Sequence, residues 1–171
     1  MRGPAGASRF ILASLLLCLP APFAATGTAQ NDAAAFQARF EREKNPVHKA
    51  KMMQQLGMAE FEEIETDVNQ GEIAEAVRIL QQYRDQARLC VEGLDAKKIN
   101  ASKHSSGFKQ LQISVQEALR RLDEIMVGLT SDQQPPFLTV RGDLQKMNDH
   151  LVQELFPGSP AGNPPAEKDT P

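Results

Sequence analysis

The feature that most constrains the fold is an apolar stripe that recurs at helical spacing through residues 108–129. At 100° per residue the stripe falls within an arc of roughly 120°. It consists of Phe108, Leu111, Val115, Ala118, Leu119, Leu122, Ile125, Met126 and Leu129. Ile113 and Val127 lie on the opposite side, where isolated apolar residues are ordinary. The segment is therefore predicted to be a long amphipathic helix that packs on other helices through one face and offers no binding site on the other.

Three further segments have helical periodicity and one apolar face each. They are residues 46–69, residues 72–94 and residues 136–155. A shorter helix is predicted over residues 31–44, where Phe36 and Phe40 lie one turn apart. Because the apolar stripe of this short helix is thin, the helix needs a partner surface to remain folded.

Residues at the predicted helix ends support these boundaries. Asn45 is a good capping residue, Pro46 suits the first helical position, and Gly71 can adopt the left-handed conformation that ends a helix. Residues 95–107 are polar and lack periodicity, which predicts one substantial surface loop. No alternating strand pattern occurs in the sequence. The predicted fold is therefore all-α: an antiparallel helical bundle of four main helices plus a short N-terminal helix.

Residues 1–29 have the composition of an export signal. The first ten residues carry two arginines and no acidic side chain, and residues 10–19 form an apolar run. This run is too short to cross a bilayer, which needs about 20 residues. Small residues before Gln30 favour cleavage there, and a cut near Ala25 is the alternative. A lipid anchor at Cys18 is disfavoured, because three leucines precede it where a small residue is needed.

Cleavage before Gln30 would leave 142 of the 171 residues, enough for one domain. We assign residues 30–157 to the helical bundle and residues 158–171 to a disordered, Pro-rich tail. Because the signal holds two of the 19 basic side chains and none of the 22 acidic ones, the remaining chain has a formal charge of −5. An exported protein of this charge is expected to be periplasmic or secreted, to bind no nucleic acid and to insert into no membrane after cleavage.

Cys90 is the only cysteine after residue 29, which excludes an intramolecular disulfide. It shares the apolar face of its predicted helix with Leu80, Ala87 and Leu94. No histidine lies near it in the sequence. A small buried apolar residue is therefore favoured over a reactive nucleophile.

The histidines provide no convincing metal site. His48, His104 and His150 lack the His-x-x-x-His spacing that brings two ligands to one helix face. His150 and Glu154 are one turn apart, with Asp149 adjacent, which is a spacing for weak binding of a divalent ion. A solvated polar face is the favoured interpretation of these three residues.

The other ionisable residues are also better explained by solvation and ion pairing than by catalysis. The acidic residues between Glu60 and Asp67 are expected to be solvated or ion-paired rather than to act as general acids or bases. Arg84 is expected to pair with one of these carboxylates. The sequence contains no phosphate-binding loop and no Gly-x-Ser-x-Gly motif, and with one Tyr and no Trp it lacks stacking platforms. We therefore predict no catalytic, cofactor-binding or metal-ligating residue and no cofactor, and we expect the protein not to be an enzyme.

Two short resemblances bear on function. Residues 58–87 resemble a tetratricopeptide unit through Gly71, Ala76 and Leu80, but no second copy occurs, so a generic helical hairpin is expected. The segment Leu129-Thr130-Ser131-Asp132-Gln133 is similar to the Leu-Thr-x-x-Gln pattern of Spy/CpxP-type periplasmic proteins. That resemblance implies an exported chaperone or stress sensor. The alternative is that Thr130 and Gln133 form a capping box.

Residues 45–157 as a whole resemble uncharacterised exported all-helical proteins of bacteria. The segments that carry the likeness are NPVHKAKMM, GEIAEAVRILQQY, GFKQLQISVQEALRRLDEI and LVQELFPG. The resemblance implies no site residues. We expect a non-enzymatic helical module of the bacterial envelope that acts on a protein partner or on itself, with a Spy/CpxP-like chaperone or stress or metal sensor as the alternative.

Overall fold

The computed structural model describes residues 27–99, residue 101 and residues 105–157, and places side chains from residue 34 onward. Within this part of the chain it contains five helices and no strand. They are α1 (Gly27–Arg42), α2 (Pro46–Gln70), α3 (Ile73–Ala96), α4 (Ser105–Val127) and α5 (Gln134–Leu155). The all-α prediction is confirmed. The predicted export signal up to residue 26 and the predicted C-terminal tail lie outside the described residues.

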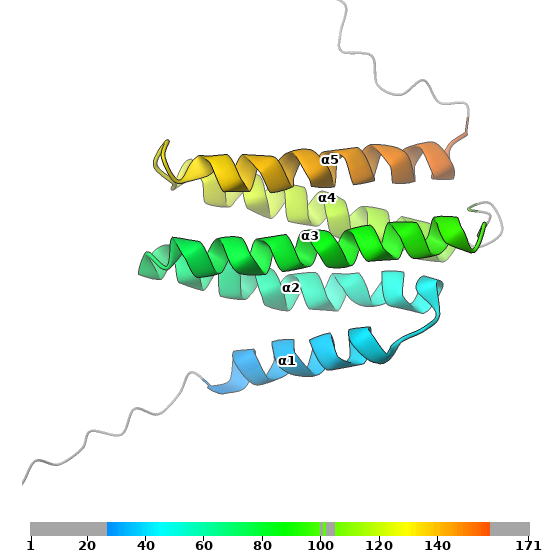
Figure 1. Ribbon diagram of the computed structural model, residues 1–171, viewed down its shortest axis with the longest axis horizontal. Coiled ribbons are helices and arrows are strands. Elements are labelled where there is room, and N and C mark those ends of the chain that lie inside the picture. Colours follow the sequence, from blue (N-terminus) through cyan, green and yellow to red (C-terminus); the bar gives the residue numbers. More distant parts are fainter. Residues whose placement is uncertain (1–26, 100, 102–104, 158–171) are drawn as a thin grey trace, which may run out of the picture.

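The four long helices form two antiparallel hairpins, α2–α3 and α4–α5, which pack side by side (Figure 1). Consecutive helices run in opposite directions, as predicted. The neighbours contributed by different hairpins run in the same direction: α2 lies beside α4, and α3 lies beside α5. Helix α1 lies at the edge of the molecule and packs on α2. The parallel pairing of α2 with α4 is the feature that creates the candidate site described below.

The ends of α2 are defined by the residues that the sequence indicated. The side chain of Asn45 accepts hydrogen bonds from the backbone N–H groups of Val47 and His48, at 3.0 and 3.4 Å. Gly71 has a φ of +81°, and the N–H of Glu72 donates to the carbonyl of Asp67. These contacts satisfy backbone groups that a helix end leaves unpaired, and the last of them belongs to a Schellman motif.

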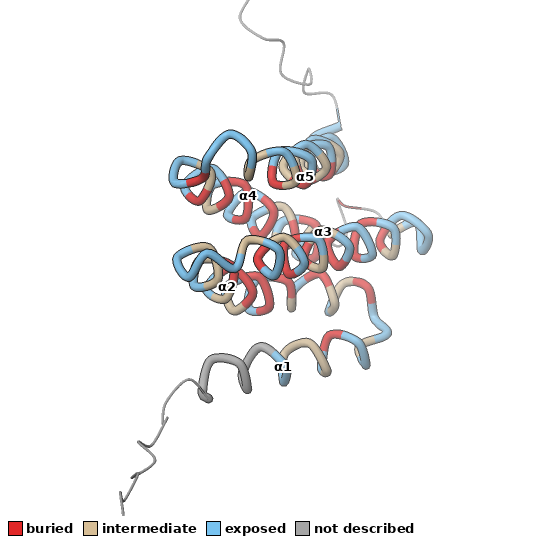
Figure 2. The backbone as a smooth tube through the Cα atoms, turned by 60° about the vertical axis from the view of Figure 1, so that its left-hand side comes forward, coloured by how far each residue is buried: buried red, intermediate tan, exposed pale blue. Residues whose placement is uncertain are grey.

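The predicted apolar stripes form one core. Buried residues line the inner faces of the four long helices (Figure 2). On α4 all members of the predicted stripe are buried except Met126, which is partly buried. Ile113 and Val127 are exposed, as predicted. None of the helices in the described part of the chain has the length and apolar character needed to cross a membrane.

The prediction of a polar surface loop over residues 95–107 was partly wrong. Helix α3 continues to Ala96 and α4 begins at Ser105, so the connection is shorter than expected. Ala101 is buried, and Ile99 packs against the core. These two apolar residues cover part of the core, which explains why the segment is less exposed than its polar composition indicated.

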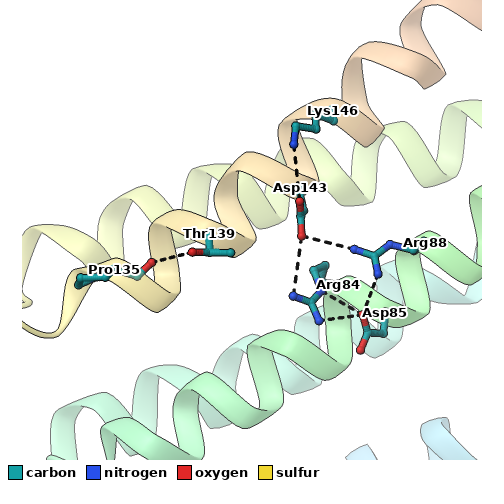
Figure 3. A network of polar contacts seen from close by, with 7 residues as sticks. All are labelled: Arg84, Asp85, Arg88, Pro135, Thr139, Asp143 and Lys146. Atoms are coloured by element: carbon teal, nitrogen blue, oxygen red, sulfur yellow. Dashed lines mark hydrogen bonds and ion pairs between the residues drawn. The ribbon is translucent and has the colours of Figure 1, made fainter.

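The predicted partner of Arg84 was also wrong. Its guanidinium faces α5 rather than α2, with Nη1 3.8 Å from Asp143 Oδ2 (Figure 3). Arg88 and Lys146 approach the same carboxylate, at 3.4 and 3.9 Å. Helix α3 has neighbours on two sides, and an apolar stripe does not specify which of them a residue at its edge will face. The pairs of Arg84 and Arg88 with Asp143 join α3 to α5 at the surface, where each contributes about 0–1 kcal/mol, whereas Lys146 and Asp143 both belong to α5.

Candidate functional site

His150 and Glu154, whose spacing on α5 would allow weak binding of a divalent ion, have different surroundings. His150 Nε2 lies 3.0 Å from Asp95 Oδ2 of α3, whereas Glu154 is exposed. The described residues contain no group of three or more His, Cys, Asp or Glu side chains placed to hold a metal ion. His104 lies outside the described residues. The position of His150 is thus explained by its contact with Asp95, which joins α5 to α3.

Cys90 is a free, fully buried cysteine, as the sequence indicated. Burial raises the pKa of its thiol to about 12. The thiol is therefore protonated at neutral pH, and because the thiolate is the reactive form, Cys90 is a packing residue.

Glu60 was wrongly predicted to be solvated. Its side chain is only 3% exposed and lies between α2 and α3. Its Oε1 accepts hydrogen bonds from Gln82 Nε2 at 2.9 Å and from Gln86 Nε2 at 3.1 Å. Its second oxygen, Oε2, is buried and has no hydrogen-bond partner. Burial of this kind favours the neutral form of a carboxyl group.

The surroundings of Glu60 are reflected in its pKa. Burial raises the pKa to about 7 from the ordinary 4.5, and this effect outweighs the hydrogen bonds from the two glutamines, which favour the ionised form. Glu63 adds to the rise, while Arg78 opposes it. Glu60 therefore changes its charge near neutral pH.

A groove runs along the surface between the parallel helices α2 and α4. It has a volume of about 550 Å³. We call it the α2–α4 groove. Its apolar lining residues are Met53, Gly57, Met58, Phe61, Tyr83, Ile113 and Ala118. Met58 is 54% exposed and Ile113 48%, so apolar surface from both helices is accessible along the groove.

Two polar contacts join α2 and α4 along the groove. Gln110 donates to Gln54 at 2.5 Å, and Arg121 pairs with Glu65 at 2.7 Å. On each helix the two bridging residues are eleven positions apart, which corresponds to roughly 16 Å, or three turns. The stretch of the groove between these contacts is therefore about as long as three turns of a further helix.

The floor of the α2–α4 groove is rigidly packed. The Tyr83 hydroxyl donates to the carbonyl oxygen of Ser114 at 3.0 Å, and its ring meets Phe61 edge-on with centroids 5.4 Å apart. Gly57 permits this arrangement, because a Cβ atom at that position would lie 2.8 Å from the Tyr83 ring. The floor is thus held in place by contacts from three helices.

Protein-family models, curated proteins and solved structures gave no match to this chain.

The structure gives the Leu-Thr-x-x-Gln segment a local role. Gln133 Oε1 accepts a hydrogen bond from the backbone N–H of Thr130 at 3.0 Å, which is one half of a capping box. Gln134 donates to the carbonyl of Leu129 at 3.1 Å. These contacts hold the turn between α4 and α5, so the pattern has a structural explanation independent of the Spy/CpxP resemblance.

Proposed function

We propose that this protein is a non-enzymatic, exported helical module of the bacterial envelope that binds a partner protein in the α2–α4 groove. The partner contributes one amphipathic helix. The observation that carries the proposal is the exposure of Met58 and Ile113 beside an apolar floor, between two polar contacts that lie three helical turns apart. Grooves of this kind bind the apolar face of a helix through side chains spaced three or four residues apart.

The charges around the groove favour a partner helix with basic flanks. Three carboxylates line it, from Glu65, Glu117 and Glu124, against two guanidinium groups. Arg121 is already paired with Glu65, and Arg120 with the other two carboxylates. The lining therefore has a net charge of −1, which complements lysine or arginine residues beside the apolar face of the partner.

The proposal can be tested with helical peptides. Peptides selected for binding from a displayed library of amphipathic helices are expected to share apolar anchors at i, i+4 and i+7 with basic flanks. Ile113→Glu should weaken their binding at least tenfold in calorimetry, because it places a charge against the apolar face of the peptide. Leu138→Glu on α5, at a residue that is 51% exposed outside the groove, is the matched control.

Equal affinities of the Ile113→Glu and Leu138→Glu variants would contradict the proposed groove. Self-association is a separate outcome, measured by light scattering. A dimer that Ile113→Glu dissociates would show that a second copy of the chain, rather than another protein, occupies the groove.

The alternative function is that of a Spy/CpxP-type protein, which would act either as a chaperone or as a sensor of stress or metal ions. Met58, which is exposed in the groove, favours the chaperone, because methionine adapts to apolar side chains of different shape. Such a protein would suppress the aggregation of an unfolded client, and absence of suppression at molar excess would count against the chaperone.

A further inference from the structure

Helix α1 packs on one neighbouring helix, α2. Only residues 43–45 separate α1 from α2 in the sequence. Phe40 is buried and Phe36 is partly buried against the core, while Lys49 Nζ lies 4.6 Å from the centroid of the Phe40 ring. A short helix held mainly by two aromatic side chains can separate from a bundle without the bundle unfolding.

Beneath α1 a continuous set of hydrogen bonds passes through Glu60. From α1, Gln37 donates to Glu41 at 2.8 Å and accepts from Gln86 of α3 at 2.6 Å. Gln86 in turn donates to Glu60 of α2. On its other side Glu60 accepts from Gln82, which accepts from Arg78. We call Gln37, Glu60, Gln82 and Gln86 the Glu60 cluster. Through the contact of Gln37 with Gln86 it connects α1 to α3.

Although the two glutamine donors favour the ionised form, the oxygen atoms left without a partner in the Glu60 cluster favour a neutral carboxyl group. Glu60 Oε2 and Gln86 Oε1 are both buried without a hydrogen-bond partner. A protonated carboxyl group has an O–H to donate to a nearby acceptor, whereas an ionised one needs further donors. The described residues provide no such donor for Oε2, so an ionised Glu60 would need water there, because a buried carboxylate with one oxygen unpartnered is unfavourable.

We propose that α1 docks on the bundle when Glu60 is protonated and separates from it when Glu60 is ionised, so that water reaches the carboxylate. Separation would break the Gln37–Gln86 contact and uncover the surface that Phe36 and Phe40 occupy. This inference does not depend on the proposed function, because the α2–α4 groove shares no residue with the Glu60 cluster.

The charged groups around the Glu60 cluster come from three helices. On α2 they are Glu63 and Lys49; on α3, Arg78 and Asp85; and on α1, Glu41. Tyr83 of α3 also lies near Glu60, but burial raises its pKa far above neutral pH, so it remains uncharged. Burial brings the pKa of Glu60 itself to about 7, which places the transition near neutral pH.

Hydrogen exchange of the purified full chain tests the proposal. At pH 8.5 the amides of residues 34–42 are expected to exchange at least tenfold faster in the wild-type protein than in Glu60→Gln, which cannot ionise. At pH 5.5 the two proteins should exchange equally. Because the intrinsic rate of amide exchange depends on pH, the two proteins are compared with each other at the same pH. The amides of α4 serve as a second control, because they exchange faster only if the whole bundle has opened. Glu62→Gln, an exposed residue of the same helix, is the control and should behave as wild type.

A fluorescence measurement provides an independent readout that does not use the Glu60→Gln variant. The chain contains no tryptophan, so Phe36→Trp introduces a single reporter on α1. Its emission should shift to longer wavelength between pH 6 and 8, with a midpoint near 7 and with a loss of helical circular dichroism no larger than the contribution of α1. Unchanged emission over this range, or equal exchange of wild type and Glu60→Gln at pH 8.5, would overturn the proposal.

Discussion

Replacement of Leu122 by alanine is expected to lower the free energy of unfolding by about 2–5 kcal/mol. The side chain is 0% exposed and lies in the core of the four long helices. Truncation removes buried methyl and methylene groups and leaves a cavity that the surrounding helices fill only in part. Urea denaturation followed by circular dichroism measures the loss, with an unchanged slope showing that the same surface is exposed on unfolding.

Ile113→Ala is the control on the same helix. Ile113 is 48% exposed, so its truncation should cost less than about 1 kcal/mol. Equal losses for Leu122→Ala and Ile113→Ala would show that α4 is buried on both sides, for example in a dimer, and would contradict the arrangement described above.

Glu60→Gln is expected to change how stability depends on pH. The pKa of Glu60 is raised to about 7 in the folded protein from 4.5, so the folded state holds a proton that the unfolded state has released. The stabilisation is therefore fully present below pH 4.5 and is lost as the pH rises through about 7. A shift of this size corresponds to at most about 3 kcal/mol. Above pH 8 the variant should be more stable than the wild type by up to this amount.

Denaturation curves at pH 4.5, 6 and 8 measure this effect. Glu63 and Asp67 also have raised pKa values, mainly through burial, so they contribute a pH dependence of the same sign in both proteins. The difference between wild type and Glu60→Gln isolates Glu60. Glu62→Gln should follow the wild-type profile. A constant difference between Glu60→Gln and wild type at all three pH values would contradict the raised pKa.

The sequence contained a signal for the burial of Glu60. Its position is four residues after Leu56 and four before Ile64, both of which belong to the apolar stripe of α2. A residue at this spacing shares the face of its neighbours. The other acidic residues nearby give the segment as a whole the pattern of a solvated or ion-paired surface. Gln86, three residues after the buried Tyr83, gave a similar signal on α3.

The α2–α4 groove could not be predicted in the same way. Apolar periodicity defined the helices and their buried faces, and Asn45 and Gly71 defined the ends of α2, because these are local properties of the chain. Met58 and Ile113 each lie outside the apolar stripe of their own helix, and they line one groove only because α2 and α4 are parallel neighbours. The choice of neighbours depends on how two hairpins pack, which a single stripe does not specify. The same ambiguity led to the wrong partner for Arg84.

The proposed role of the groove is tested most directly by site-specific photocrosslinking in cells of the source organism. A photoreactive amino acid at Met58 should give a discrete adduct with one partner protein, and Ile113→Glu should abolish it. The same amino acid at Leu138, which is similarly exposed on α5, should give no such adduct. An adduct at both positions that survives Ile113→Glu, or no adduct at Met58, would contradict the proposal that this protein binds a partner through the α2–α4 groove.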